Sequence, residues 1–140
     1  MLAIVLRRHG CDVTLLGSED ADPPEAFDRV LEAAGTSTAW RRAVALLRPG
    51  GTAVMFGGLP GGTEVPFDAT RLHYAGLTIR GAFHHAPRHV RDALALLAAD
   101  PEPFRPLLTH RYGLDEVATP LAMTCGLLPR DGLLKAVIEP

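Results

Sequence analysis

Residues 48–62 read RPGGTAVMFGGLPGG, a short apolar run enclosed by three pairs of glycines. The run TAVMF at 52–56 lies between turn signals, a pattern typical of a short strand buried on both faces. Glycine-rich stretches of this kind also occur in loops that hold phosphate groups. The stretch is therefore either a phosphate cradle or a strand held between two turns, and the flanking sequence has to decide.

The flanking sequence argues against the cradle. A phosphate-binding loop leads from a strand directly into a helix, because the helix N-terminus supplies free N–H groups and a positive dipole. Residues 57–62 are instead followed by TEVPFD, which does not begin a helix, and their spacing fits neither GxGxxG nor GxxxxGK followed by Ser or Thr. The glycines then allow a tight exit from the strand, where either a flat ligand approaches the backbone closely or the turn is plain surface.

Outward from this strand, short apolar segments alternate with turns. The segments expected as strands are 13–16 (VTLL), 77–83 (LTIRGAF) and 134–138 (LKAVI), and 27–34 (FDRVLEAA) fits either a strand or a helix. Four segments are expected as helices. The first is 2–9, and the second carries Trp40, Val44 and Leu47 on its apolar stripe, begins after a cap at 35–37 and stops at 49–51. The third runs from Pro87 to Asp100, and the fourth is 114–125, which Pro120 should kink or split. Strands that alternate with helices indicate βα units and a mostly parallel sheet.

The composition is that of a cytoplasmic globular chain. Its 140 residues suit one domain, expected to span 1–140, and 47% apolar against 21% charged residues exclude a disordered chain. A formal net charge of −2 gives no basic face for nucleic acid, and no apolar run approaches the ~18 residues of a membrane-spanning helix. The two cysteines, Cys11 and Cys125, form neither a CxxC motif nor a disulfide framework. These features predict a reduced chain in the cytoplasm, with no nucleic-acid and no membrane partner.

The polar residues suggest no metal-binding or catalytic set. His84 and His85 are adjacent at the end of an expected strand, so they face opposite ways and cannot both bind one metal ion. The two cysteines and the other histidines show no ligand spacing. Glu32 in LEAAG either orients a neighbouring backbone or has a purely structural role. The sequence therefore predicts no metal ligand and no catalytic residue.

The order of the pieces is more specific than any one of them. FDRVLEAAGT, LLRPGGTAVMFGGLP, LTIRGAF, VRDALALLA, PLLTHRYGLDEVATPLA and LKAVIEP follow one another along the chain. In this order they resemble the C-terminal, nucleotide-binding part of the medium-chain zinc-type alcohol dehydrogenases, of the sorbitol and threonine dehydrogenase kind. The resemblance covers residues 27–140, and residues 2–16 more weakly. It implies an α/β fold: a partial Rossmann-like, doubly wound, mostly parallel sheet that lacks the first strand and part of the following units.

The resemblance also implies where a nicotinamide dinucleotide, NAD or NADP, would bind. In open parallel sheets, ligands lie outside the carboxyl ends of the strands. The matching positions are Ala33 and Ala34 near the adenosine ribose, Phe56, Gly57 and Gly58 beside the nicotinamide ribose and ring, Ala82, Phe83 and His84 near the carboxamide, and Lys135 near the pyrophosphate. At the end of VTLL, where NAD-preferring relatives carry an acid, Gly17 and Ser18 lean toward NADP by analogy.

The departures from the family pattern carry predictions of their own. The sequence has no counterpart of the family's first strand with its glycine fingerprint, nor of the separate lobe to which the family's zinc belongs. Without the first strand, segments 13–16 and 27–34 must pair directly or leave open edges, so we expect a rearranged sheet or strong self-association. In relatives the strand that matches 77–83 pairs with its copy in a second subunit, which implies a homodimer.

Three functions are compatible with these features. The first is the NAD(P)-binding part of a zinc-type alcohol or polyol dehydrogenase, which transfers a hydride between an alcohol and nicotinamide; this chain by itself would not be catalytically complete. The second is a non-catalytic dimerising remnant without a ligand. The third is a fragment of an S-adenosylmethionine-dependent methyltransferase, which shares an FD strand and an L-x-PGG motif. Against the third, the glycine motif for the methyl donor is absent, and LTIRGAF follows where a helix is usual.

Overall fold

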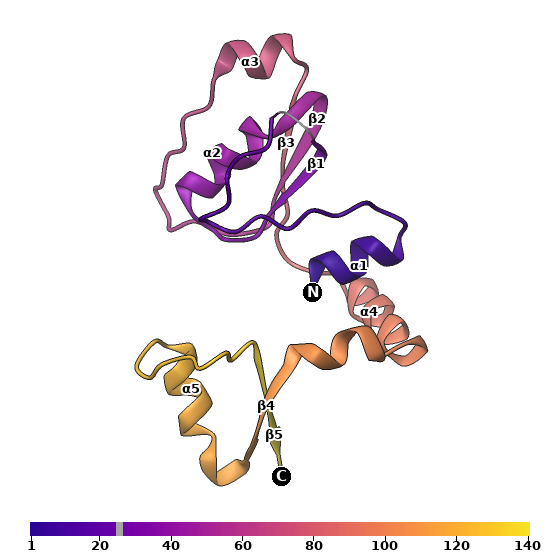
Figure 1. The fold of residues 1–140 in the computed structure, drawn as a ribbon, viewed down its shortest axis with the longest axis vertical. Coiled ribbons are helices and arrows are strands. Elements are labelled where there is room, and N and C mark those ends of the chain that lie inside the picture. The colour runs from indigo at the N-terminus through magenta and orange to yellow at the C-terminus, as the bar shows by residue number, and fades with distance from the viewer. Residues whose placement is uncertain (25–26) are drawn as a thin grey trace. The chain divides into compact units, whose positions relative to one another are not determined.

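The computed structural model describes residues 1–24 and 27–140, and its contacts divide the chain into two units. One unit is residues 16–84, called here the 16–84 unit. The other combines residues 1–15 with residues 85–140 and is called here the terminal unit. Figure 1 labels the helices and strands of both, and each unit is described by itself.

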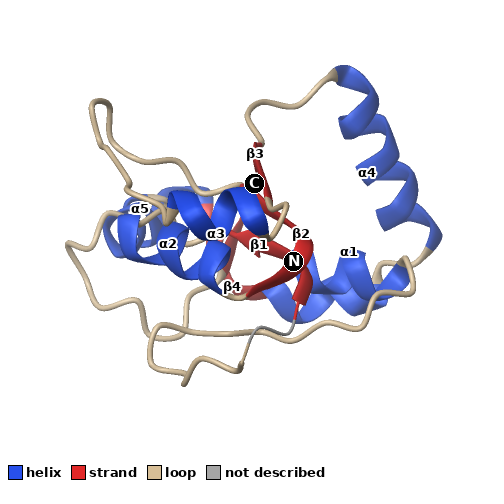
Figure 2. Cartoon of the chain, turned by 90° about the horizontal axis from the view of Figure 1, so that it is seen from above, coloured by secondary structure: helices blue, strands red, loops and turns tan. Residues whose placement is uncertain are grey.

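The 16–84 unit is built on a parallel sheet of three strands. The strands are β1 (Phe27–Glu32), β2 (Leu47–Met55) and β3 (Thr78–Gly81), in the order β1-β2-β3. Ala53 in the middle strand pairs with Val30 on one side and with Ile79 on the other. Figures 1 and 2 show the three strands side by side. The parallel strands confirm the α/β interpretation, and β1 decides the ambiguous segment 27–34 in favour of a strand.

Helix α2 (Ser37–Ala45) connects β1 to β2 and packs against both. It begins where the sequence predicts, because the hydroxyl of Thr36 accepts a hydrogen bond from the Ala39 N–H at 3.1 Å and caps the helix. The core of the unit lies between helix and sheet. It consists of the buried residues Ala43, Val44, Leu47, Ala53 and Met55, with Val30, Trp40, Phe67, Leu77 and Ile79 packed against them.

The C-terminal end of α2 differs from the prediction. The helix ends at Ala45, and Leu47, which was expected on its apolar stripe, is the first residue of β2. Leu47 is fully buried in the core from this strand position. Residues 49–51 therefore do not stop the helix; they lie within β2, at the point where its register with β1 shifts. Gly50 has φ +77°, a conformation open to glycine, and this allows the irregular pairing.

Helix α3 (Ala69–Tyr74) was not expected from the sequence. Its cap is readable in retrospect, since the Asp68 carboxylate accepts a hydrogen bond from the Arg71 N–H at 2.9 Å. The Arg71 guanidinium donates to the carbonyl oxygens of Val44 at 2.8 Å and Leu47 at 2.6 Å. These two bonds join α3 to the last turn of α2 and to the first residue of β2.

The terminal unit contains three α-helices, two 3-10 helices and a second parallel sheet. Its elements are α1 (Leu2–Arg8), α4 (Pro87–Ala99), η1 (Glu102–Leu107), β4 (Leu108–Gly113), η2 (Leu114–Glu116), α5 (Ala118–Thr124) and β5 (Lys135–Glu139). Strands β4 and β5 pair in parallel. The Arg8 guanidinium forms an ion pair with Asp100, which connects α1 to the end of α4. No helix of the described residues is long and apolar enough to cross a membrane.

Several predictions for this unit are confirmed. Pro87 begins α4 and Asp100 ends it, as expected from the missing N–H of proline and its fixed φ. The segment 114–125 is split into η2 and α5. Pro120 lies in the first turn of α5, where its missing N–H costs no intrahelical bond.

Two expectations about the strands are corrected, and a third is confirmed. Residues 13–16 form no strand, and Leu15 and Leu16 are exposed. Strand β4 was not expected, and it pairs with β5 in a sheet of its own, so the described strands form two sheets instead of one. Within the described residues β1 pairs only with β2, and its other edge is open, which is the second of the two outcomes expected for a chain without the family's first strand.

Candidate functional site

The carboxyl ends of β1, β2 and β3 lie at one edge of the sheet in the 16–84 unit. The strands are parallel and in register, with Met55 opposite both Glu32 and Gly81. The backbone continues this pairing beyond the strands, because the Phe56 N–H donates to the Glu32 carbonyl at 2.9 Å and the Ala82 N–H donates to the Met55 carbonyl at 3.0 Å. Eight of the nine predicted cofactor-binding residues are brought to this edge: Ala33, Ala34, Phe56, Gly57, Gly58, Ala82, Phe83 and His84.

Glu32 connects the first two strand ends. The residue is only 5% exposed, and its side-chain Oε1 accepts hydrogen bonds from the N–H groups of Ala34 at 2.6 Å and Gly35 at 2.7 Å. Its backbone carbonyl accepts from the N–H groups of Phe56 at 2.9 Å and Gly57 at 3.0 Å. One residue therefore holds the turn after β1 with its side chain and the exit of β2 with its main chain. This confirms the interpretation of Glu32 as a residue that orients a neighbouring backbone.

Two glycines let these strand ends touch. Gly35 has φ +69°, and a Cβ placed on it would lie 2.7 Å from the Gly58 carbonyl oxygen. A Cβ on Gly57 would lie 2.4 Å from the Gly35 nitrogen. Both distances are shorter than any real carbon contact, so neither position admits a side chain without movement of the backbone. The turn after β1 and the exit of β2 form a single packed floor without side chains.

Trp40, in the first turn of α2, also contacts the place where the ends of β1 and β2 meet. Its indole Nε1–H donates to the Gly57 carbonyl at 3.0 Å. The peptide groups on both sides of Gly57 are thus engaged within the protein, as are the N–H groups of Ala34 and Gly35. Amides that already donate cannot cradle a phosphate, which agrees with the interpretation of residues 52–56 as a strand with a tight exit. Trp40 was expected only as part of an apolar stripe, and no sequence signal pointed to its polar contact.

Aromatic rings stand at the ends of β2 and β3. Phe56 is 57% exposed and Phe83 is 86% exposed, although large apolar side chains are usually buried. The His84 ring lies 3.8 Å from the Phe83 ring, centre to centre, at an interplanar angle of 43°. His84 also has φ +59°, a conformation that side-chain-bearing residues rarely adopt. Exposed rings beside a backbone floor without side chains offer a surface on which a flat, partly apolar ligand can lie.

The loop that follows VTLL, where NAD-preferring relatives carry an acid, is anchored by Arg42. The guanidinium donates to the Gly17 carbonyl at 2.5 Å and to the Asp20 carbonyl at 2.7 Å, and it pairs with the Asp22 carboxylate at 2.5 Å. The Asp20 carboxylate in turn accepts a hydrogen bond from the Gly17 N–H at 2.6 Å. The loop at 17–22 is therefore ordered by one side chain of α2, which no sequence motif indicated.

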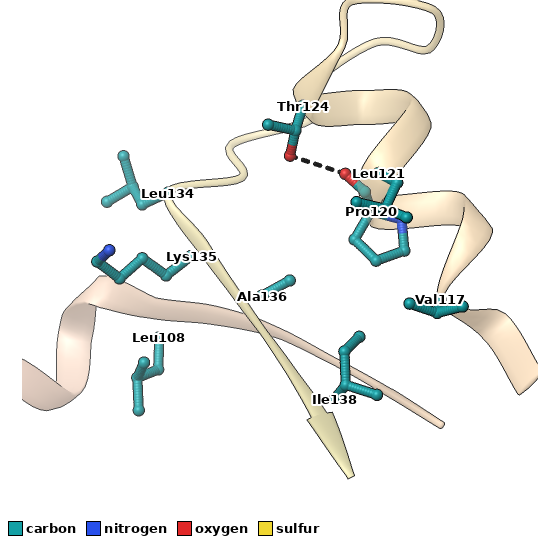
Figure 3. A pocket seen from close by; sticks show the side chains of 9 residues that line it. All are labelled: Leu108, Val117, Pro120, Leu121, Thr124, Leu134, Lys135, Ala136 and Ile138. Carbon is teal, nitrogen blue, oxygen red and sulfur yellow. Dashed lines mark hydrogen bonds between the residues drawn. The ribbon is translucent and has the colours of Figure 1, made fainter. Parts of the chain in front are cut away.

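Lys135, the ninth predicted residue, lies in the terminal unit at the start of β5. It borders a cavity of about 380 Å³ between α5 and the β4–β5 sheet, and Figure 3 shows its side chain extended from the strand on the side away from Pro120. The cavity is otherwise lined by Leu108, Val117, Pro120, Leu121, Thr124, Leu134, Ala136 and Ile138. The Thr124 hydroxyl donates to the Pro120 carbonyl at 2.8 Å. Lys135 is the one charged side chain among these described lining residues. Its contact with a pyrophosphate stays a prediction.

The described residues do not fit a zinc site. In residues 1–24 and 27–140, no group of three or more His, Cys, Asp or Glu side chains lies close enough to hold a metal ion. A zinc ion in proteins needs three or four convergent ligands of these types. Within the described part of the chain, no chemical step can therefore be assigned to bound zinc.

Comparison with known proteins identifies the family. Residues 6–99 match the family model described as zinc-binding dehydrogenase, and this match covers more than half of the chain. The chain belongs to the zinc-binding dehydrogenase family, which confirms the resemblance drawn from the order of its sequence pieces.

Individual relatives agree with this assignment. The L-threonine 3-dehydrogenase of Deinococcus radiodurans is 27% identical over 105 residues, which are 75% of this chain and 30% of that protein. The L-threonine 3-dehydrogenase of Shewanella oneidensis is 30% identical over 92 residues, 66% of this chain and 26% of that protein. The chain thus spans less than a third of the length of these curated relatives.

Solved structures give the same fold. A zinc-binding dehydrogenase from Sinorhizobium meliloti 1021, bound to NADP, superimposes with a TM-score of 0.71 at 28% identity, over 84% of this chain and 33% of that chain. An alcohol dehydrogenase from Thermotoga maritima superimposes with a TM-score of 0.70 at 26% identity, over 81% of this chain and 30% of that chain. The fold is that of part of a Rossmann-like dehydrogenase, as predicted.

Proposed function

We propose that this chain is the NAD(P)-binding part of a zinc-type alcohol or polyol dehydrogenase, and that residues 1–140 together form part of its dinucleotide-binding domain. The observation that carries the proposal is the edge of the sheet at which three parallel strands end around a floor of glycines and exposed aromatic rings. The NADP bound to the S. meliloti dehydrogenase supports a nicotinamide dinucleotide as the ligand.

The proposed contacts of a bound dinucleotide combine the three strand ends with the positions that the resemblance implies. Ala33 and Ala34 meet the adenosine ribose, and Phe56, Gly57 and Gly58 meet the nicotinamide ribose and ring. The nicotinamide ring is flat, so it gains most from a surface on which no Cβ stands in its way. The backbone at Ala82, Phe83 and His84 meets the carboxamide. The positive charge of Lys135 at the pyrophosphate rests on the resemblance alone.

These 140 residues by themselves bind the cofactor without turning over an alcohol. In a zinc dehydrogenase, bound zinc polarises the oxygen of the substrate, and the described residues offer no ligand set for it. The contribution of this chain to hydride transfer is then to bind and orient the nicotinamide. The exposed and unpaired cysteines, Cys11 and Cys125, agree with a reducing compartment such as the cytoplasm.

A titration of the purified chain with NADH and NADPH tests the proposal. Trp40 is the single tryptophan of the sequence and its indole bonds to the proposed nicotinamide floor, so bound NADH should quench Trp40 fluorescence as it saturates. We expect saturable quenching by at least one of the two reduced cofactors and none by S-adenosylmethionine. Quenching by S-adenosylmethionine alone would point to a methyltransferase fragment, and no saturation by any of the three would contradict the proposal.

A dimerising remnant without a ligand is the second candidate, because β3 has an open edge within the described residues. An unpaired strand edge offers free N–H and C=O groups to another chain. Pairing of two copies through residues 77–83 would form a homodimer whether or not a cofactor binds. The titration separates the two functions. A remnant associates with a second copy, but neither NADH nor NADPH quenches its Trp40 fluorescence.

A further inference from the structure

We infer that Glu32 and Trp40 are positioning residues, which fix the distance between the adenosine end and the nicotinamide end of the cofactor site. This inference rests on the proposed function, because it concerns a ligand that spans the ends of β1 and β2. The group formed by Glu32, Gly35, Trp40 and Gly57 is called here the strand-end junction.

The Glu32 carboxylate is placed for positioning and not for maximal stability. Its Oε1 is saturated by two short bonds from Ala34 and Gly35, at 2.6 and 2.7 Å. Its Oε2 is buried and has no hydrogen-bond partner among the described residues. A buried carboxylate oxygen without a donor carries a desolvation cost, which the two bonds of Oε1 have to offset. What the carboxylate uniquely provides is the fixed orientation of the peptide groups after β1.

Trp40 provides the matching constraint after β2. Its Nε1–H reaches the Gly57 carbonyl at 3.0 Å, while the Gly57 N–H donates to the Glu32 carbonyl at 3.0 Å. A glycine has wide conformational freedom, and anchors on both of its peptide groups remove that freedom. The Gly57 backbone is thereby held against Gly35, with no space for a Cβ between them.

Rigid spacing matters most to a ligand with two halves. When one half of a dinucleotide is bound, the other half binds as if at a high local concentration, provided that its site is held at the right distance. If the junction loosens, each half-site can still bind its own fragment, and only the gain from joining the halves is reduced. Substitutions that loosen the junction should therefore lower the affinity for the whole dinucleotide more than the affinity for either half.

The experiment compares NADH with its halves, AMP and reduced nicotinamide mononucleotide, on the full 140-residue chain. The variants are Trp40→Phe, which removes the N–H donor and keeps most of the ring, Glu32→Ala, which removes the carboxylate, and Glu32→Gln, which keeps an acceptor oxygen in its place. NADH binding is followed by nicotinamide fluorescence and fragment binding by NMR shifts. Glu116→Gln is the matched control, because Glu116 likewise accepts a backbone N–H, from Gly113 at 3.0 Å, but in the terminal unit.

We expect NADH to bind roughly tenfold more weakly to Glu32→Ala and about threefold to tenfold more weakly to Trp40→Phe, from the worth of one or two buried hydrogen bonds. The affinities for the two fragments change by less than about twofold, and Glu32→Gln regains most of the NADH affinity. If Glu32→Ala fails to fold, Trp40→Phe and Glu32→Gln still give the comparison. Equal losses for NADH and both fragments, or no loss for NADH, would overturn the positioning role. Failure of the unaltered chain to bind NADH would instead overturn the proposed function, and this inference with it.

Discussion

At the scale of single residues, Gly57 is the position at which the site admits least change. A methyl group on it would lie 2.4 Å from the Gly35 nitrogen, 2.7 Å from the Gly35 Cα and 2.8 Å from the Glu32 Oε2. Two of these three neighbours are backbone atoms, which cannot turn aside as the end of a long side chain can. The requirement for glycine is therefore set by contact between two strand ends, and the φ of Gly57 plays no part in it.

The substitution Gly57→Ala tests this contact. We expect it to lower the free energy of unfolding by about 2–4 kcal/mol, because either the two strand ends separate or the strain of overpacking stays in the fold. Urea unfolding followed by circular dichroism measures the loss. Gly61→Ala is the control, since a Cβ there meets no atom within 4 Å and should change the unfolding free energy by less than about 0.5 kcal/mol. Equal effects of the two substitutions would mean that the close contact does not exist in solution.

At the scale of elements, most helices and strands were predicted from signals in neighbouring residues. The strands that were predicted wrongly or missed depend on pairing between segments that are distant in the sequence. The cap at Thr36 and Pro87 at the start of α4 were readable because each depends on residues next to it. Residues 13–16 have the composition of a buried strand but form none, since a strand also needs a neighbour to pair with. The separate pairing of β4 with β5 likewise depends on segments that no local pattern connects.

The same distinction applies to the candidate site. The glycine pairs and the order of the strand ends pointed to Ala33, Gly57 and their neighbours from sequence. The contact of Trp40 with Gly57 and the anchoring of residues 17–22 by Arg42 join positions 17 and 20–25 residues apart. No periodicity encodes such contacts, so they became visible only in three dimensions.

The anchor of the 17–22 loop gives a prediction at this scale. Arg42→Lys keeps the charge but replaces a planar fork by a single ammonium group, which cannot reach Gly17, Asp20 and Asp22 at once. We expect the amides of residues 17–22 to exchange hydrogen about tenfold faster, because roughly one hydrogen bond to a charged group is lost. Hydrogen exchange with mass spectrometry measures the change. Arg41→Lys, at the exposed neighbouring position of α2, should leave the exchange unaltered, and an equal response to both substitutions would refute the anchor.

At the scale of the whole molecule, the open edges of the sheet and the exposed apolar side chains point to association. Among the described residues, β1 and β3 each have one unpaired edge, and exposed large side chains such as Phe83, Leu94, Leu127 and Leu134 occur in both units. Proteins usually protect such edges or pair them with another chain. The edge of β3 combines an unpaired strand with exposed Thr78 and Arg80, and it is the edge through which we propose that two copies pair.

Sedimentation equilibrium over a range of protein concentrations decides whether the chain pairs in this way. We expect a reversible dimer, because joining two β3 edges would continue the sheet across both copies. Thr78→Lys places a further positive charge beside Arg80 on each copy, so paired edges would repel one another and the dimer should dissociate about tenfold more readily at low salt. High salt should restore much of the association, since it screens exposed charges. Thr119→Lys, at an exposed position of α5, is the control for added charge. A monomer at every concentration, or equal weakening by both lysines, would exclude pairing through β3, while the nicotinamide titration would still stand as a separate test of cofactor binding.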